Sequence, residues 1–314
     1  MLDASQLAAL AAIHRRGSFE LAASELHVTP SAVSQRLKAL EERIGTLLVR
    51  RGQPCTATEA GLRLIRHHDE VVLLEKALAA DLPGAAPGPA TLRVAVNADS
   101  LATWVIPALA ATDGFLFDIV IDDQDVSQEW LRRGEVAAAV TSHPGPLQGC
   151  DTLPLGRLRY RATANPAYVA RWFPDGVDAR SLSRAPALVF SDKDRLQDRW
   201  VASVAGEGVA RAGFPSHRLA SSQGFVDACL AGLGWCLNPE LLVAGHLAEG
   251  RLCELVADRP LDVPLHWQFA RLTAAAIAPL SRAMQAARSR SPASGRSSSA
   301  GSGPRWDGRQ PACA

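Results

Sequence analysis

Apolar residues near the amino terminus recur with the period of an α-helix. One stripe, with steps of three and four residues, is formed by Val33, Leu37, Leu40 and Ile44. Such spacing places these side chains on one helix face. Thr29 precedes the stripe and can cap the helix, and Pro30 suits its first position because the missing N–H costs nothing there. The pattern therefore predicts a helix that begins at Thr29 or Pro30.

A second, shorter helix is predicted just upstream, over residues 19–26. Its apolar residues are Phe19, Leu21, Ala22, Ala23 and Leu26. His27 and Val28 leave only a tight connection to the next helix. Two short helices joined by such a turn are typical of a helix-turn-helix, which we place at residues 21–40.

Residues 47–58 have the pattern of a small two-stranded hairpin that turns at residues 51–54. A hairpin directly after a helix-turn-helix is expected to be a wing. Residues 1–60 are therefore predicted to form a winged helix-turn-helix domain.

The next predicted helix follows Thr58, which can cap it. Its apolar stripe consists of Leu64, Val71, Leu74 and Leu78. A lone helix cannot bury such a stripe, so we expect residues 58–82 to form a linker helix that pairs with its copy. The chain would then be a homodimer, with a homotetramer as the alternative.

The chain changes character at residues 83–90, a Pro/Gly/Ala-rich stretch that we interpret as a hinge. Beyond it, strands are predicted at residues 92–96, 117–122, 136–141, 187–190, 218–221 and 265–270. Helices are predicted at residues 101–111, 126–133, 196–205 and 224–231. Strand–helix alternation is typical of a parallel, doubly wound sheet, and these elements suffice for two α/β lobes.

Composition favours a folded chain with a polar end. Of 314 residues, 47% are hydrophobic and 21% are charged, as in globular proteins. Residues 289–314 are rich in Ser, Gly, Arg and Pro and are expected to be disordered. The amino terminus lacks a basic leading segment, and no apolar run reaches the ~20 residues of a membrane-spanning helix. We expect a soluble, cytoplasmic protein without a membrane partner.

Charge and cysteine content narrow the candidate chemistry. The formal net charge is only +1, so any surface for nucleic acid must be local. The six cysteines include no CxxC pair and no Cys/His cluster with zinc-ligand spacing. We therefore expect neither a metal site nor a cofactor.

The polar face of the helix after Thr29 suits the major groove of DNA. Its candidate contacts are Thr29, Ser31, Ser34, Gln35, Arg36 and Lys38. Gln35 can pair with adenine and Arg36 with guanine, while the others reach phosphates or base edges. Arg50 and Arg51 of the hairpin would lie against the neighbouring backbone or minor groove. One such cation alone would be an ordinary solvated side chain, but the combined pattern predicts binding to double-stranded DNA.

These features resemble the LysR-type transcription regulators over nearly the full length of the chain. The resemblance rests on Leu21-Ala22-Ala23-Ser24-Glu25-Leu26-His27-Val28-Thr29-Pro30-Ser31-Ala32-Val33-Ser34-Gln35-Arg36-Leu37, then Leu40, Glu41, Gly45, Leu47, Arg50, Thr58, Ala60 and Gly61. Leu48 departs from the Phe common in the family, and Pro30-Ser31 replaces a common Gln-Pro order.

The resemblance implies a two-lobed, periplasmic-binding-protein-like α/β effector domain over residues 91–288. Lobe I would comprise residues 91–163 and 265–288, and lobe II residues 164–264. RNA polymerase is a further partner that such a regulator could contact.

Within the family, the chain looks most like the arginine- and lysine-responsive regulators of basic amino-acid export. That narrower resemblance is carried by Val94-Ala95-Val96-Asn97-Ala98-Asp99-Ser100-Leu101-Ala102-Thr103-Trp104, Val28 to Arg36, and Leu131-Arg132-Arg133-Gly134-Glu135-Val136. It implies a basic amino acid as effector and an exporter gene as target.

Ligands of doubly wound sheets bind beyond the carboxyl ends of the strands. Candidate residues there are Asn97, Asp99, Ser100, Thr103, Trp104, Asp122, Asp123, Thr141, Ser142 and Ser222. Ser100, Thr103 and the backbone N–H groups of a helix start could hold a carboxylate. Asp99 and Asp122 would attract a cation, and Trp104 could offer a cation–π face. The same side chains could instead cap helices, line a solvated turn or fill the core.

Other functions remain alternatives. An enzyme is disfavoured because the chain has no GxSxG, P-loop or HExxH motif, and the glycines at residues 206–213 have the wrong spacing for a dinucleotide site. A solute-binding protein would lack the helix-turn-helix. A nucleoid-type DNA-binding protein without an effector, or a LysR-type regulator of a different small metabolite, would share most of these features.

Overall fold

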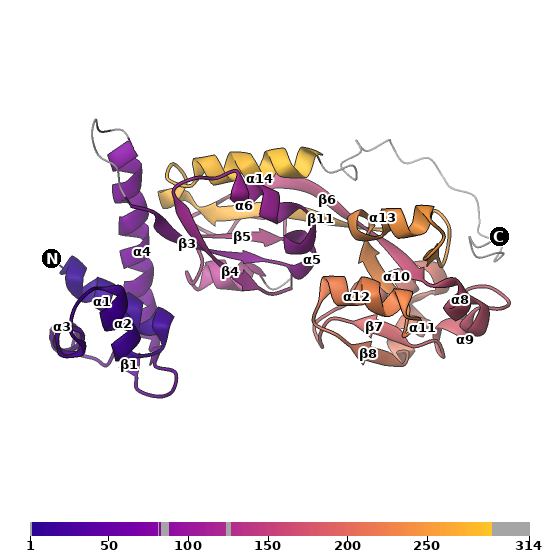
Figure 1. Ribbon diagram of the computed structural model, residues 1–314, viewed down its shortest axis with the longest axis horizontal. Helices are drawn as coiled ribbons and strands as arrows, with labels where there is room; N and C mark the ends of the chain where they lie inside the picture. Colours follow the sequence, from indigo (N-terminus) through magenta and orange to yellow (C-terminus); the bar gives the residue numbers. More distant parts are fainter. Residues whose placement is uncertain (1, 81, 83–87, 124–126, 291–314) are drawn as a thin grey trace.

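The computed structural model describes residues 2–80, 82, 88–123 and 127–290. The predicted hinge core, residues 83–87, and most of the predicted tail, residues 291–314, lie outside the described residues. A helical amino-terminal domain is followed by one long helix and then by two lobes built on strands (Figure 1).

The amino-terminal domain has the predicted elements. They are α1 (Ala4–Arg16), α2 (Phe19–Glu25), α3 (Pro30–Ile44), β1 (Val49–Arg50) and β2 (Thr56–Ala57). Thr29 caps α3 by accepting a hydrogen bond from the Ala32 N–H at 3.2 Å. Val33, Leu37 and Leu40 are buried in the small core that α1, α2 and α3 share, while Ile44 is exposed. The predicted start of this helix is confirmed, and so is its apolar face, except for Ile44.

The linker helix α4 (Glu59–Ala80) starts after Thr58, whose Oγ1 accepts a hydrogen bond from the Gly61 N–H. Leu73 on one side of α4 packs into the core of the first lobe. Leu74 and Leu78 on another side are 39% and 60% exposed. Part of the predicted stripe thus lies open on this chain.

Lobe I contains a parallel sheet with the strand order β5–β3–β4. Its elements are β3 (Ala90–Val96), α5 (Ala98–Ser100), a π-helical turn (Leu101–Val105), α6 (Ile106–Ala110), β4 (Phe115–Ile121), α7 (Ser127–Arg132) and β5 (Ala138–Thr141). The helix predicted over residues 101–111 is therefore interrupted by a π turn.

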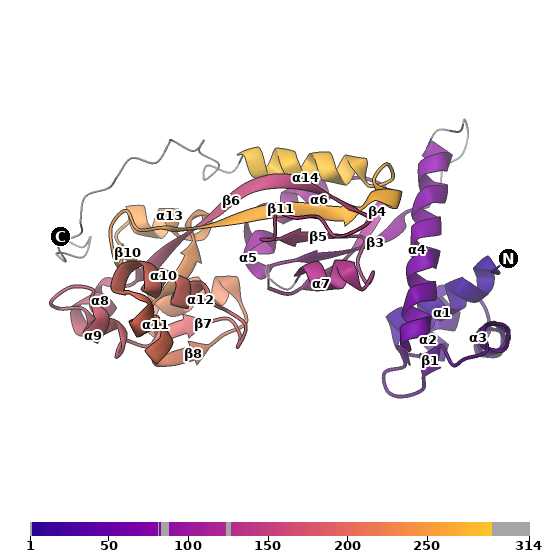
Figure 2. The same ribbon diagram turned by 180° about the vertical axis from the view of Figure 1, so that it is seen from behind.

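Two long strands join the lobes, β6 (Cys150–Ala164) and β11 (Leu261–Ala270) (Figure 2). They pair with each other antiparallel, and β11 is also antiparallel to β5. The sheet is thus mixed, and the prediction of a purely parallel sheet was wrong. The reason is that the chain enters lobe II along β6 and returns along β11, so the two strands must run in opposite directions.

Lobe II contains shorter strands and more α-helices than lobe I. Its elements are α8 (Pro166–Trp172), α9 (Ala179–Leu182), β7 (Ala187–Val189), α10 (Leu196–Ala205), α11 (Glu207–Ala212), β8 (Ser216–Arg218), α12 (Ser222–Leu230), β9 (Cys236–Pro239), α13 (Glu240–Ala248) and β10 (Cys253–Glu254). The strand predicted at 218–221 ends at Arg218, because Ser221 already caps α12 by accepting from the Gly224 N–H.

After β11, a short 3-10 helix (Arg271–Thr273) leads to α14 (Ala278–Arg290), which returns to lobe I and packs against β6 and α6 (Figure 1). Ser289 and Arg290 belong to its last turn, so the expected disorder cannot begin at 289. No helix in the described part of the chain combines the length and apolar character that a bilayer crossing needs.

Candidate effector cleft and DNA-binding face

A cavity of about 290 Å³ lies where the two lobes face each other. From lobe I it is lined by the residues that follow β3 and β4, and from lobe II by the loop between β7 and α10 and by α12. The polar residues in its lining are Asn97, Asp99, Asp122, Asp123, Ser191, Asp192, Lys193 and Asp194. Five of them are aspartates and one is a lysine, so the cavity is strongly acidic.

Asp99 accepts hydrogen bonds from two distant parts of the chain. Tyr160 on β6 donates to Oδ2 at 2.8 Å, and Ser222 at the start of α12 donates to Oδ1 at 2.6 Å. Burial raises the pKa of Asp99, the two hydrogen bonds counteract this in part, and nearby Asp194 raises the pKa further. A cation beside Asp99 would relieve this unfavourable buried charge.

Asp122 is the second charged anchor of the cleft. Its carboxylate accepts from the Trp130 indole N–H at 2.8 Å and from the Asp123 backbone at 2.8 Å, and Lys193 of lobe II lies 3.4 Å away. Burial acts to raise the pKa of Asp122, but these donors outweigh it and lower the pKa overall. Asp122 is therefore ionised at neutral pH.

Asn97 is a polar side chain with unmet hydrogen-bonding capacity. It is only 2% exposed and lines the cavity, and neither its Oδ1 nor its Nδ2 has a partner within the described residues. A buried amide without partners costs free energy. A polar ligand in the cavity could satisfy both atoms.

Other predicted effector residues lie elsewhere. Thr103 donates to the Asp99 carbonyl, and with Trp104 it lines a different groove between α6 and α14. Ser100 and Thr141 are buried, and neither they nor Ser142 line the cavity; Thr141 accepts from the His143 N–H. The structure thus brings Asn97, Asp99, Asp122, Asp123 and Ser222 together at the cleft.

The sequence interpretation missed Tyr160 and the cleft residues Phe190, Asp192, Lys193, Asp194 and Phe225. Asp192 to Asp194 follow β7, so the strand-end rule that selected Asp122 would have found them too. Asp194 accepts from the Phe190 and Leu196 backbone N–H groups at 2.9 and 3.0 Å, and burial raises its pKa.

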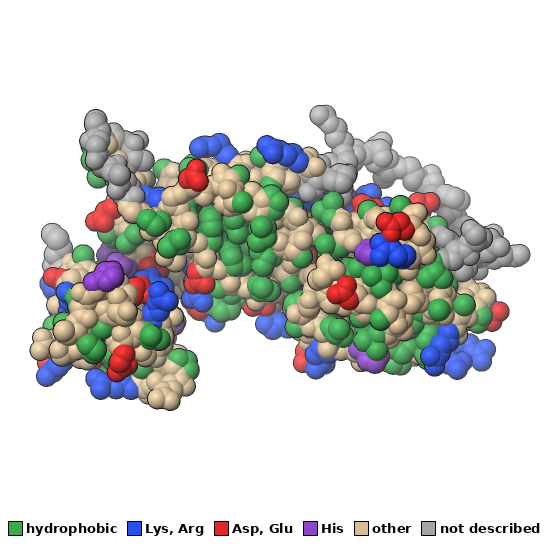
Figure 3. Space-filling view, viewed as in Figure 1, with side chains coloured by type: hydrophobic (Ala, Val, Ile, Leu, Met, Phe, Trp, Pro, Cys, Tyr) green, Lys and Arg blue, Asp and Glu red, His purple; other side chains and the backbone are tan. Residues whose placement is uncertain are grey.

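On the amino-terminal domain, α3 presents a polar outer face. Ser31, Ser34, Gln35 and Lys38 are exposed, and Arg36 is partly exposed. The hydroxyls of Thr29 and Ser31 form a hydrogen bond of 3.0 Å, and the Thr29 hydroxyl also accepts from the Ala32 N–H. Thr29 is therefore engaged in capping α3. Lys and Arg side chains lie along the lower edge of this domain in Figure 3.

The hairpin beside α3 is held in place by Glu41. The Glu41 carboxylate accepts from the Leu48 N–H at 2.8 Å, and Leu48 is fully buried. A Cβ at position 61 would lie 2.2 Å from the Leu48 carbonyl oxygen, so only glycine lets α4 approach the hairpin this closely. Arg50 and Arg51 are exposed beyond this anchor, and the Arg51 guanidinium lies over the Phe19 ring. The geometry of α3 and the hairpin is that of a winged helix-turn-helix.

Comparison with known proteins gives this arrangement a family. The description "Bacterial regulatory helix-turn-helix protein, lysR family" matches residues 4–62, and "LysR substrate binding domain" matches residues 86–289. The chain belongs to the LysR family. It is therefore a DNA-binding transcription regulator, and the interpretation as an enzyme is set aside.

Curated relatives and solved structures place this LysR-family chain near two named regulators. It is 45% identical to the transcriptional regulator ArgP of Pseudomonas fluorescens, over 86% of this chain and 92% of the relative. The crystal structure of ArgP from Mycobacterium tuberculosis has a TM-score of 0.76 and 41% identity, covering 92% of this chain and 98% of that one. Full-length LysG of Corynebacterium glutamicum with bound effector Arg has a TM-score of 0.64 and 37% identity, covering 91% and 98%. The resemblance to this branch is confirmed.

Proposed function

We propose that this regulator senses arginine or lysine in the cleft between its lobes. The observation that carries the proposal is the excess of five aspartates over one lysine around a cavity that also holds an unsatisfied, buried Asn97. A ligand with two positive groups and one carboxylate matches this surface. The effector Arg bound to Corynebacterium glutamicum LysG, at 37% identity, supports the same ligand class.

In this proposal the aspartates and the lysine have separate tasks. Asp99 and Asp122 take the positive groups of the ligand, and Asp123 and Asp194 add negative potential nearby. Lys193 and the Asn97 amide take the α-carboxylate. Ser222 and Tyr160 orient the Asp99 carboxylate by donating to its two oxygens.

Two of these side chains also form bonds between the lobes, so ligand binding affects the distance between lobe I and lobe II. Ser222 reaches Asp99 and Lys193 reaches Asp122 across the cleft, so both bonds join lobe I to lobe II. A basic ligand competes with Lys193 for Asp122 and supplies new bonds between the lobes. Ligand binding therefore favours one spacing of the lobes over another.

On the DNA side, the proposed contacts are those of α3 and the wing: Thr29, Ser31, Ser34, Gln35, Arg36, Lys38, Arg50 and Arg51. Two chains pair through α4, whose Leu74 and Leu78 are exposed, with a homotetramer as a further assembly. The proposed domains are residues 1–60, the linker helix 58–82, the hinge 83–90 and the effector domain after it. The target is an exporter gene for basic amino acids, transcribed in the cytoplasm by RNA polymerase.

Calorimetry on the full chain tests the ligand. Arginine or lysine should bind, and leucine and glutamate should not. Removing one partner of a buried, hydrogen-bonded ion pair costs about 2–5 kcal/mol, so Asp99→Asn should weaken binding by tenfold or more. Asp175→Asn, at an exposed aspartate of lobe II that does not line the cleft, is the matched control and should bind like wild type.

The alternatives have distinct outcomes in the same experiment. Tight binding of leucine or glutamate would indicate a LysR-type regulator of another metabolite. Absence of binding by all four amino acids, with operator affinity intact, would favour a DNA-binding protein without an effector. Normal arginine binding by Asp99→Asn would place the ligand elsewhere.

A further inference from the structure

Trp130 on α7 is attached to the effector cleft through its polar edge. Its indole N–H donates to the Asp122 carboxylate at 2.8 Å. The ring is partly buried against a small apolar cluster that includes Ala95, Leu131 and Val136. A shift of the Asp122 carboxylate would therefore displace the Trp130 ring.

The same ring also lies beside two cations, Arg93 and Arg133. The Arg93 guanidinium lies 5.8 Å from the ring centroid and the Arg133 guanidinium 5.0 Å, both within cation–π range. Arg93 is also paired with Asp118 at 3.2 Å. Arg93 lines a second, small cavity of about 70 Å³, between lobe I and the linker helix α4.

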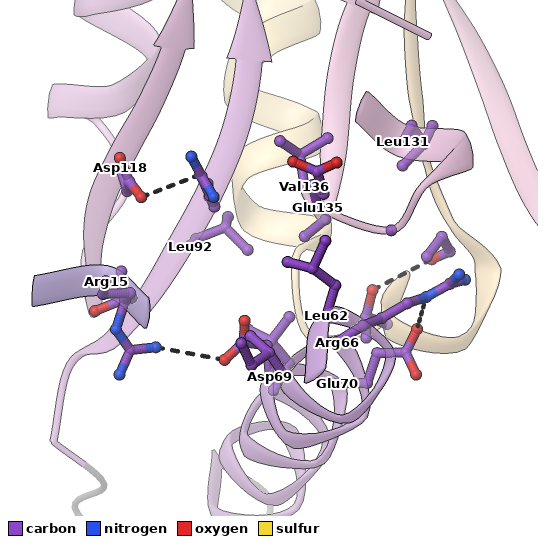
Figure 4. Close-up of a pocket in the computed structure, with 18 of the residues that line it drawn as sticks. Arg15, Leu62, Arg66, Asp69, Glu70, Leu92, Asp118, Leu131, Glu135 and Val136 are labelled. Atoms are coloured by element: carbon purple, nitrogen blue, oxygen red, sulfur yellow. Dashed lines mark hydrogen bonds and ion pairs between the residues drawn. The ribbon is translucent and has the colours of Figure 1, made fainter. Parts of the chain in front are cut away.

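Figure 4 shows this second cavity, with Glu135 and Val136 of lobe I facing Arg66 and Asp69 of α4. The turn after α7 is tied to Trp130, because the Glu135 N–H donates to the Trp130 carbonyl at 2.9 Å. Gly134 in this turn has φ +68°, and a Cβ there would lie 2.2 Å from Cδ of Arg66. The end of α7 is thus seated directly on the linker helix.

Ion pairs continue from α4 into the DNA-binding domain. Asp69 lies 3.5 Å from Arg15 on α1, and Arg15 lies 3.1 Å from Glu25 on α2. α2 packs against α3, the proposed recognition helix. A displacement of α4 relative to lobe I would therefore carry α3 with it.

We propose that Trp130 is the positioning residue that transmits the state of the effector cleft to the linker helix. When a ligand draws Asp122 away from its present partners, the indole moves, and with it the guanidiniums of Arg93 and Arg133 and the Gly134 turn, which packs against Arg66 of α4. The identity of the natural trigger rests on the proposed function, whereas the connection from Asp122 to Arg66 rests on the contacts themselves.

A simple packing role for Trp130 predicts something different. A core residue would affect stability but would not make distant substitutions depend on one another. Residues that share no partners normally have additive effects on free energy. Dependence between Asp122, which lines the effector cleft, and Arg66, which lines the second cavity, is therefore the property to measure.

The test is a mutant cycle on operator affinity without any amino acid. The full chain binds a DNA duplex selected for tight binding, and Asp122→Ala and Arg66→Ala are measured singly and together. In wild-type background the double variant should deviate from the product of the single effects by about threefold or more. In the Trp130→Phe background, where an aromatic ring remains but the N–H is lost, the double variant should equal the product of the two single effects. Trp172→Phe on α8 and Arg63→Ala on the exposed face of α4 are the controls.

The proposal would be overturned if the double variant equalled the product of the single effects in the wild-type background. It would also be overturned if the double variant still deviated from that product with Trp130→Phe. If Trp130→Phe does not fold, ¹⁹F resonances of 5-fluorotryptophan-labelled protein decide instead. A tryptophan resonance that shifts with both Asp122→Ala and Arg66→Ala, but not with Arg63→Ala, supports the relay, and its absence contradicts it. A wild-type chain that binds neither arginine nor lysine would refute the proposed function, while this cycle would still decide the role of Trp130.

Discussion

Ser222 of lobe II donates a hydrogen bond of 2.6 Å to the carboxylate of Asp99 in lobe I. The two residues are 123 positions apart in the chain. The bond opposes the rise in the pKa of Asp99 that burial causes, and it connects the two lobes.

Ser222→Ala should lower the free energy of unfolding. A hydrogen bond to a charged group contributes roughly 1.5–3 kcal/mol, and its loss leaves the buried Asp99 carboxylate with Tyr160 as its side-chain donor. The loss should be larger at pH 7 than in acid, because the hydrogen bond from Ser222 lowers the pKa of Asp99 and so favours its ionised form. Urea unfolding at both pH values measures it. Ser183→Ala at an exposed serine is the control and should change stability by no more than about 0.5 kcal/mol.

Arg36→Ala should weaken specific operator binding by roughly 1–3 kcal/mol if Arg36 pairs with a guanine. Lys38→Ala should instead weaken binding to all sequences alike and reduce the salt dependence by about one ion, since a phosphate contact releases one counterion. Footprinting and titrations at several salt concentrations separate the two. Unchanged affinity and base preference for Arg36→Ala would remove it from base readout.

The parts of the fold that follow from local chemistry were predictable. The start of α3 depends on Thr29 and Pro30, and its end on Gly45, which takes φ +81°. Each of these signals lies within a few residues of the structure that it specifies. The strands β3 and β5 likewise have mostly apolar sequences because they are interior strands of the sheet with mostly buried side chains.

The crossing strand β6 was not predictable in this way. Pro154 and Gly156 interrupt its pattern, and its register with β11 shifts between Leu265 and His266, so no single alternation runs along it. Tyr160 reaches Asp99 only because β6 leaves lobe I at that point. The Asp122 to Trp130 bond was also hidden, since a tryptophan at position 130 has the spacing of an ordinary apolar helix residue.

Pairing of α4 with a second copy should depend on Leu74 and Leu78. They are 39% and 60% exposed on the single chain, and burying them removes apolar surface from water. Replacing both with Glu should give monomers in sedimentation and weaken operator binding, because two half-sites can no longer be held together. Leu233→Glu, at a leucine of lobe II that is 43% exposed, is the control and should leave the assembly unchanged. Dimers of the double variant at low concentration would contradict the prediction.

Asp69 on α4 should make stability depend on pH. Burial raises its pKa from 3.8 to about 6, although Arg15 and Arg93 act in the opposite direction. Since the folded protein holds this proton more tightly than the unfolded chain, the contribution of Asp69 to stability is favourable in acid. It is lost as the pH rises from about 3.8 to about 6.

Asp69→Asn should therefore be more stable than wild type at pH 7. The gain should be no more than about 1 kcal/mol, because 46% of the side chain is exposed and water screens the charge. The difference between the two proteins should shrink as the pH falls from 6 toward 4, which thermal unfolding across this range would show. Asp113→Asn, at an exposed aspartate of lobe I, serves as the control and should show no such trend. A variant that is less stable than wild type at pH 7 would mean that the ion pair with Arg15 outweighs the cost of burying the Asp69 charge.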